Sequence, residues 1–156
     1  MFRLSKKTDY ALMALQYLAS KGASGVVSAR SIAERFDIPL ELLAKILQQL
    51  AHQGLVAAHK GIHGGYQLAR PALAISVADV AEAIDGPMTL TACSHVDVRC
   101  EQFATCTVRD PLWRIRERIL SVLQTVTVAD MDDQLRGPGP VPLTVRKEPN
   151  VPVQAS

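Results

Sequence analysis

The sequence predicts a mainly α-helical protein, in which a winged helix-turn-helix domain with a two-stranded β wing precedes a cysteine-rich loop and a long dimerisation helix. Three observations predict this fold class. Two short amphipathic segments, residues 28–36 and 39–53, lie on either side of a tight turn. A glycine-rich turn at residues 60–65 joins two strand-like runs. A longer amphipathic segment, residues 111–126, follows all three cysteines of the chain.

The chain divides into four predicted parts. Residues 1–87 form the winged helix-turn-helix domain, and residues 88–109 form the loop that contains the cysteines. Residues 110–136 hold the dimerisation helix and a short C-terminal helix. The last segment, 137–156, begins Gly-Pro-Gly-Pro and is rich in proline, a composition that predicts a disordered tail.

Local signals predict the first three helices. The segment 4–20 is helical by the spacing of its leucines and alanines. Ser28 is a good N-cap for a second helix that extends to about Phe36. Pro39 suits the first position of a third helix, because its missing N–H has no intrahelical partner there. Gly54 is expected to end that third helix in a left-handed conformation.

The third helix has an apolar and a polar face, and a β hairpin follows it. The apolar face predicts burial of Leu42, Leu43, Ile46, Leu47 and Leu50. The polar face carries Glu41, Ala44, Lys45, Gln48 and Gln49. Residues 55–59 and 66–70 read as the two strands. At the tip, glycines allow close approach to a phosphate backbone, and Lys60 supplies charge.

These features predict an interface with double-stranded operator DNA. Residues 1–75 carry nine lysines and arginines against four acidic residues, whereas residues 76–136 carry six against ten. A basic first half suits a polyanion, although ordinary surface charge explains the asymmetry equally well when it is taken alone. The residues expected at the interface are Ser28, Pro39, Glu41, Ala44, Lys45, Gln48, Gln49, Lys60, His63 and Gly64.

The elements after the hairpin also have start signals. A capping-box-like segment, 76–79, begins a fourth helix, and Asp-Gly-Pro at residues 85–87 ends it. Asp110 is expected to cap the long helix and Pro111 to begin it, while Thr127 caps a last short helix.

The apolar surface of the long helix predicts a homodimer. One winged-helix core is too small to cover so broad a surface, so the helix is expected to pack against its copy in a second subunit. Packing back onto its own domain is the alternative. No apolar run approaches the ~20 residues that span a bilayer, and the N-terminal residues lack the apolar core of a signal peptide. We therefore expect a cytoplasmic protein without a membrane partner.

The three cysteines lie within fourteen residues, at Cys93, Cys100 and Cys106, with the spacing Cys-x6-Cys-x5-Cys. An odd number of thiols in a reducing compartment argues against a structural disulfide, and the polar surroundings argue against burial. An iron–sulfur cluster takes thiolate ligands and accommodates these spacings, so it is the favoured interpretation. Metal-free thiol chemistry remains open. Zinc also remains open, although its usual ligand spacings are shorter.

A fourth ligand is not specified by the spacing. His95 is local, but it lies only two residues from Cys93, a strained reach to the same iron. Asp9, on the first helix, could reach the loop of a partner subunit in a dimer. On the residues alone, a first-turn carboxylate favoured by the helix dipole is the simpler explanation of Asp9.

An enzyme, for instance a thiol-based scavenger of peroxide or nitric oxide, is the interpretation from another functional class. The sequence contains no nucleophile–base pair and no pocket motif that supports it. We therefore expect no catalytic residues and no small-molecule substrate.

Several segments together resemble one family. They are the opening Leu-Ser-Lys-Lys-Thr-Asp-Tyr-Ala-Leu, the wing Lys-Gly-Ile-His-Gly-Gly-Tyr-Gln-Leu-Ala-Arg, the segment Ile-Ser-Val-Ala-Asp-Val-Ala-Glu-Ala-Ile-Asp-Gly-Pro and the three cysteines. They resemble the Rrf2 family of bacterial transcription regulators, to which IscR-like and NsrR-like iron–sulfur proteins belong. Over residues 1–135 the likeness is strongest to regulators of the SUF iron–sulfur assembly operon. Their loop entry is similar to residues 90–94, and their Val-x-Leu-Ala-Asp-Met ending is similar to residues 126–131.

The resemblance implies a homodimer on a pseudo-palindromic operator, with one cluster per subunit. It places Cys93, Cys100 and Cys106 on the family's cluster cysteines. It places Asp9 where NsrR-like members use an aspartate of the partner subunit as fourth ligand. The implied function is an iron–sulfur-dependent repressor of SUF genes that senses cluster, iron, redox or nitric oxide status. We favour a 2Fe-2S cluster, with 4Fe-4S as the alternative.

Three positions depart from the IscR-like pattern. The histidine that IscR-like members place three residues after the third cysteine is Arg109 here, so their ligation does not transfer. The recognition-helix glutamate is replaced by Ala44, and a wing arginine is replaced by Lys60. We therefore expect a different operator preference.

Overall fold

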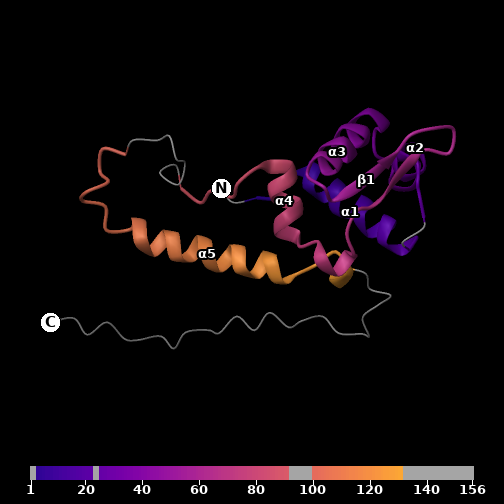
Figure 1. Cartoon of the computed structure of the whole chain (residues 1–156). Helices are drawn as coiled ribbons and strands as arrows, with labels where there is room; N and C mark the ends of the chain where they lie inside the picture. The colour runs from indigo at the N-terminus through magenta and orange to yellow at the C-terminus, as the bar shows by residue number, and fades with distance from the viewer. Residues whose placement is uncertain (1–2, 23–24, 92–99, 132–156) are drawn as a thin grey trace.

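The computed structural model of the protein describes residues 3–22, 25–91 and 100–131. It is mainly helical, with one two-stranded antiparallel sheet that forms a hairpin at one end of the molecule (Figure 1), as predicted. The elements are α1 (Lys6–Ser20), α2 (Ala29–Phe36), α3 (Leu40–His52), β1 (Val56–His59), β2 (Gly65–Leu68), η1 (Ala72–Ala74), α4 (Val77–Asp85), α5 (Arg109–Thr125) and η3 (Ala129–Met131).

The core forms where α1, α2, α3 and α4 meet, and it is almost entirely aliphatic. The largest side chains with less than 2% exposure include Leu15, Leu18, Ile32, Leu43, Ile46, Leu47, Leu50, Leu55, Ile75 and Val80. Burying each such side chain contributes about 1.5–3 kcal/mol, so this core stabilises the helices against the entropy of the unfolded chain. The predicted buried stripe of α3 is confirmed, with Leu42 at its half-buried margin.

Hydroxyl groups cap the first two helices. The Ser5 hydroxyl accepts a hydrogen bond from the Thr8 N–H at 3.2 Å, and α1 therefore begins slightly later than predicted. The Ser28 hydroxyl accepts from the Ser31 N–H at 3.1 Å, which confirms the predicted cap of α2. Each bond satisfies a backbone donor that lacks an intrahelical partner.

The turn between α2 and α3 depends on Asp37. Its backbone adopts φ 53° and ψ 45°, a left-handed conformation that aspartate tolerates better than most side chains. The next N–H, of Ile38, donates to the Ala33 carbonyl at 3.0 Å, and the Ile38 side chain is buried. Pro39 is the N-cap residue of α3 and not its first helical residue, so the helix begins at Leu40, one residue later than predicted.

The hairpin is joined to the rest of the domain by a third extended segment. β1 and β2 pair in register from Val56 opposite Leu68 to His59 opposite Gly65. Val27, in the connection between α1 and α2, then pairs with Tyr66 through two backbone hydrogen bonds of 2.9 and 2.8 Å. The strands of the wing are therefore connected, near their turn, to the segment that leads into α2.

The fourth helix begins as predicted, but the fifth does not. Ser76 and Asp79 form the reciprocal capping box of α4. Helix α5 begins at Arg109 after Val108, which provides no side-chain cap, so the predicted cap at Asp110 is wrong. The physical reason is that the Asp110 carboxylate accepts from Arg109 Nε at 2.8 Å instead of bonding backbone N–H groups.

The chain returns to the core after α5. The Val77 N–H donates to the Val126 carbonyl and the Val128 N–H donates to the Ile75 carbonyl, both at 2.8 Å. Val128 is fully buried. The predicted cap at Thr127 is confirmed by reciprocal bonds with Asp130, although the structure describes only the short turn η3 after it.

Helix α5 differs from the four α-helices before it because none of its residues is buried. Its C-terminal half lies beside α4, where Leu123 packs against the core, so the predicted alternative of packing onto its own domain is correct for one face. The large apolar side chains left at least one-third exposed in α5 and beside it are Val108, Trp113, Ile115, Val122 and Val126. Residues 100–108 lie at the end of α5 farthest from the wing (Figure 1).

Some expectations fall outside the described residues, namely those for Cys93, His95, the end of the last short helix and the tail 137–156. Among the described helices, none is long and apolar enough to cross a membrane.

Candidate nucleic-acid interface and cysteine segment

The outer face of α3 exposes most of the side chains predicted to meet DNA. Glu41, Lys45 and Gln48 are exposed, and the smaller Ala44 is half-buried between them. All four lie opposite the leucine stripe that fixes α3 in the core. The arrangement gives α3 a rigid outer face that is mainly polar, with Leu40 exposed in its first turn.

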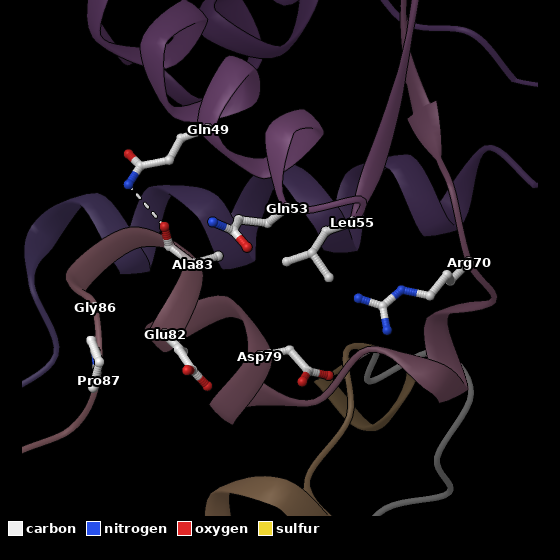
Figure 2. Close-up of a pocket in the computed structure, with 9 residues that line it drawn as sticks. All are labelled: Gln49, Gln53, Leu55, Arg70, Asp79, Glu82, Ala83, Gly86 and Pro87. Carbon is white, nitrogen blue, oxygen red and sulfur yellow. Dashed lines mark hydrogen bonds between the residues drawn. The ribbon is translucent and has the colours of Figure 1, made fainter.

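Gln49 is the exception on this face. Its side-chain amide nitrogen donates to the Ala83 carbonyl at 2.8 Å (Figure 2) and to the Ile84 carbonyl at 3.3 Å. Both carbonyls belong to the last turn of α4. Because its amide links α3 to α4, Gln49 is not part of the surface that we propose meets DNA.

The N-terminus of α2 contributes a basic group that the sequence reasoning missed. The Ser28 hydroxyl lies 2.9 Å from that of Ser31 and already caps the helix, so its role is to hold the first turn in place. Arg30, in that first turn, is exposed. A cation next to a good N-cap residue is the signal that could have identified Arg30, because helix N-termini bind phosphate groups.

The wing tip is narrow and fully accessible. Lys60 and His63 are exposed, and Ile62 between them is 99% exposed, another residue that the sequence reasoning did not single out. Gly61 has φ 117°, a conformation that side chains rarely adopt. A Cβ on Gly64 would lie 2.4 Å from the His59 carbonyl oxygen, so this glycine keeps the turn tight rather than presenting a contact surface.

The described part of the cysteine segment holds two accessible thiols. Cys100 and Cys106 are free and half-buried. A short turn lies between them, in which the Phe103 N–H donates to the Cys100 carbonyl at 3.1 Å. The Arg109 guanidinium lies 4.4 Å from the centre of the Phe103 ring and donates to the Phe103 carbonyl at 3.2 Å. Arg109 therefore organises the turn between the thiols.

Asp9 is exposed in the first turn of α1, and one chain does not bring it to these thiols. Within the described ranges, no three His, Cys, Asp or Glu side chains gather closely enough to hold a metal ion. A site that includes Asp9, Cys100 and Cys106 would therefore need two subunits.

Asp85 connects the start of α1 to the end of α4. Its Oδ2 atom accepts from the Ser5 N–H at 3.0 Å and from the Thr8 hydroxyl at 2.8 Å. Partial burial raises the pKa of Asp85, but the bonds from Ser5 and Thr8 and the charge of Lys7 outweigh it, so the pKa lies below its usual value. The carboxylate form is the one that holds α1 to α4.

A winged helix, a cysteine segment and a long helix follow one another along this chain. The Rrf2 family, described as iron-dependent transcriptional regulators, matches residues 4–134. The chain belongs to the Rrf2 family. It is therefore a transcriptional regulator of the winged helix-turn-helix type and not an enzyme.

Rrf2 relatives agree with this assignment. Rv1287 of Mycobacterium tuberculosis, whose name describes an HTH-type transcriptional regulator, is 37% identical over 83% of this chain and 80% of its own. The structure of CymR, the global cysteine regulator of B. subtilis, has a TM-score of 0.68 and 30% identity, and the match covers 83% of this chain and 95% of CymR. The structure of T. potens IscR has a TM-score of 0.64 and 27% identity, with 88% and 94% covered.

Proposed function

We propose that this Rrf2 protein is an iron–sulfur-dependent repressor whose cysteine segment controls operator binding. The observation that carries the proposal is the grouping of all three cysteines of the chain within fourteen residues, in a family described as iron-dependent regulators. The proposed ligands are Cys93, Cys100, Cys106 and the Asp9 carboxylate of a second subunit. A 2Fe-2S cluster is favoured over 4Fe-4S.

The chemistry of the two described thiols suits this role. Cys100 and Cys106 are free, partly accessible and set in a polar turn, which favours their thiolate form over that of a thiol buried among apolar groups. The cluster would supply a centre that responds to iron supply, oxidants or nitric oxide. A carboxylate fourth ligand, harder than a thiolate, would make that centre more labile. The role of Arg109 is to hold the turn between Cys100 and Cys106 through the Phe103 ring and carbonyl.

A homodimer through α5 completes the proposal. The exposed side chains of Ile115 and Val122 lie two turns apart on one face of α5. Antiparallel or crossed packing of two such helices would bury this face and bring two DNA-binding domains together. It would also allow the first helix of one subunit to approach the cysteine segment of the other.

On DNA, α3 lies in the major groove of each half-site. Lys45 and Gln48 face base edges or phosphates, and Lys60 and His63 at the wing tip contact the adjacent minor groove or its backbone. Half-sites one helical turn apart make affinity sensitive to the distance between the two α3 helices. A change in the cysteine segment that alters this distance therefore alters repression. The proposed targets are SUF assembly genes.

A metal-free thiol switch of the same fold is the second candidate. It is favoured by the free state of Cys100 and Cys106 and by the similarity of the chain to CymR, a cysteine regulator. Oxidation of two thiols in one short segment would form a disulfide and release two electrons to an oxidant such as a peroxide. A zinc site with the same cysteines is the third candidate.

The deciding experiment is purification without oxygen, with analysis of iron, zinc, sulfide and visible absorption. We expect iron and sulfide in the wild-type protein and colourless Cys100→Ala protein. Thr107→Ala, an exposed neighbour in the same segment, is the matched control and should keep its colour. Wild-type protein with neither iron nor sulfide would overturn the cluster, and DNA affinity that responds to diamide would then favour the thiol switch. Zinc without sulfide would favour the zinc site.

A further inference from the structure

Residues 83–88, which we call the junction, form the end of α4 and the start of the connection to the cysteine segment. Side chains from three other helices bond to this short stretch. Gln49 of α3 donates to the Ala83 and Ile84 carbonyls, and Arg116 of α5 donates to the Met88 carbonyl at 2.8 Å. The Asp85 carboxylate accepts from the start of α1. The junction is thus bonded to the recognition helix, the long helix and the helix that carries Asp9.

The Gln49 amide acts as a C-terminal cap of α4. The last four carbonyls of a helix have no intrahelical donors and need other partners. The Gly86 N–H, with φ 82° at that glycine, satisfies only the Glu82 carbonyl, at 3.0 Å. The next two carbonyls, of Ala83 and Ile84, receive their donor from α3. A cap supplied by a different helix ties the position of α3 to the end of α4.

Packing and hydrogen bonds together join α3 to the junction. Leu47 and Leu50 of α3 belong to the same buried core as Ala83 and Ile84. Beside this core, a hollow of about 600 Å³ lies between the C-terminal part of α3, the base of the wing and α4. Figure 2 shows the Gln49 amide at the edge of this hollow, where it reaches the Ala83 carbonyl. The hydrogen bonds of Gln49 therefore add a directional link at the margin of the packed contact.

We infer that Gln49 is a positioning residue that couples the cysteine segment to the DNA-binding face of α3. This inference rests on the proposed function. A change of state at the cysteines moves the chain that enters the segment, and the junction lies on that chain, at the end of α4. Movement of the junction shifts the carbonyls that Gln49 bonds, and α3 follows. Lys45 and Gln48, which precede Gln49 on α3, then change their position relative to DNA.

The test uses the full-length protein and a duplex that the wild-type protein selects from a random-sequence pool. Affinity for this duplex is measured with protein loaded anaerobically with ferrous iron and sulfide, after chelation, and after diamide oxidation. The largest ratio of affinities between two of these states measures the coupling. We expect Gln49→Met to lower this ratio about fivefold, the low end of allosteric couplings, because it keeps the length of the side chain but removes both donors.

Two variants separate coupling from general damage. Gln49→Lys should retain the wild-type ratio, because an ammonium group can donate to the same carbonyls and is favoured at a helix C-terminus. Gln53→Met makes the same chemical change beside the same hollow and should also retain the ratio. A thermal melt of each variant checks that it is folded, as expected for exposed positions.

The outcomes separate the inference from the proposed function. A wild-type ratio of one would overturn the sensing function, and the coupling with it. A clear wild-type ratio that Gln49→Met preserves would overturn the coupling alone. Loss of the ratio in both Gln49→Met and Gln49→Lys, or equally in Gln53→Met, would show that the hydrogen bonds to Ala83 and Ile84 are not the route.

Discussion

The N-terminal domain and α5 are stabilised in opposite ways. In the N-terminal domain, α1, α3 and α4 each bury several side chains, and Leu15, Leu47 and Val80 are fully buried. In α5, a helix longer than any of these, no side chain is buried, and Val122 is 61% exposed. The domain therefore contains its own core, whereas α5 has a large apolar face that one chain leaves uncovered.

This difference in burial indicates that one set of residues controls folding and another controls association of chains. Helices in proteins gain most of their stability from packing of an apolar face and little from intrinsic propensity, so a helix with one uncovered apolar face gains stability from a partner. Residues of the domain should determine whether the chain folds, and residues on the free face of α5 should determine how many chains associate.

The largest effect is expected in the core. Leu15→Ala removes three buried carbon atoms and should lower the free energy of unfolding by about 2–5 kcal/mol, since the space cannot close completely. Val122→Ala on α5 should change it by less than ~0.5 kcal/mol at concentrations where the protein is monomeric. Urea denaturation measures both. Equal costs would mean that α5 belongs to the same folding unit as the core.

Association of two chains, in contrast, should be more sensitive to substitutions on α5 than to substitutions in the core. Ile115→Glu with Val122→Glu places two carboxylates on the exposed apolar face of α5 and should give a monomer in sedimentation. Affinity for a two-half-site operator should then fall roughly a hundredfold, since the second half-site no longer benefits from the first. Ser121→Glu adds a charge to an exposed polar position of the same helix and should leave the dimer intact. A double variant that stays dimeric would remove this face from the interface.

The wing should contribute charge without contributing stability. Lys60→Ala should lower the slope of log affinity against log salt by about one, because one phosphate contact is lost, and should weaken binding to all sequences similarly. Ile62→Ala at the same tip removes an exposed apolar group without changing charge, so its salt slope should equal that of the wild type. An unchanged slope for Lys60→Ala would argue against a phosphate contact at the tip.

The smallest effect is expected at Asp85, which holds two parts of the domain together. Its pKa is lowered in the folded protein, so its stabilisation is present above the unfolded value of about 4 and is lost as pH falls through the lower folded value. With solvent screening we expect ~0.5 kcal/mol or less. Asp85→Asn should flatten the decline of stability between pH 5 and pH 3, measured by urea titration at each pH, to about this extent. A decline equal to that of the wild type would mean that the bonds from Ser5 and Thr8 do not depend on the charge.

Most of the fold could be predicted because its signals are local. Ser28 and the capping box at residues 76–79 are short-range hydrogen-bonding patterns, and the leucine stripe of α3 is a periodicity within one helix. The start of α5 was mispredicted because Asp110 had two possible partners, and the neighbouring Arg109 was bonded instead of the helix N-terminus. Periodicity gives no sign of the burial of Val128, since it depends on a return of the chain to residues 75–77.

In the candidate site as well, features set by local spacing were predictable and long-range contacts were not. Exposure of Lys45 and Gln48 follows from helical spacing, and it was predicted correctly. The bond from Gln49 to the end of α4 joins residues more than thirty positions apart, so a polar side chain on an outer face looked like another DNA contact. Cysteine spacing indicates the chemistry of a metal or redox site, but the proposed fourth ligand, Asp9 of a second subunit, depends on how two chains pack together, which the pattern of one chain does not describe.

Gly65 lies so close to the Val27 carbonyl that a Cβ would approach the oxygen to 2.4 Å. The neighbouring Tyr66 pairs with Val27, so the end of the strands nearest the turn is held to the connection before α2, and only the turn from Lys60 to Gly64 extends beyond this pairing. Within this turn, the backbone of Gly61 and the close approach of Gly64 to the His59 carbonyl restrict substitution, whereas Lys60, Ile62 and His63 are exposed and can be exchanged without disturbing the scaffold behind them. Under the proposed contact of the tip with DNA, swapping these three side chains between relatives should carry groove preference from one regulator to another.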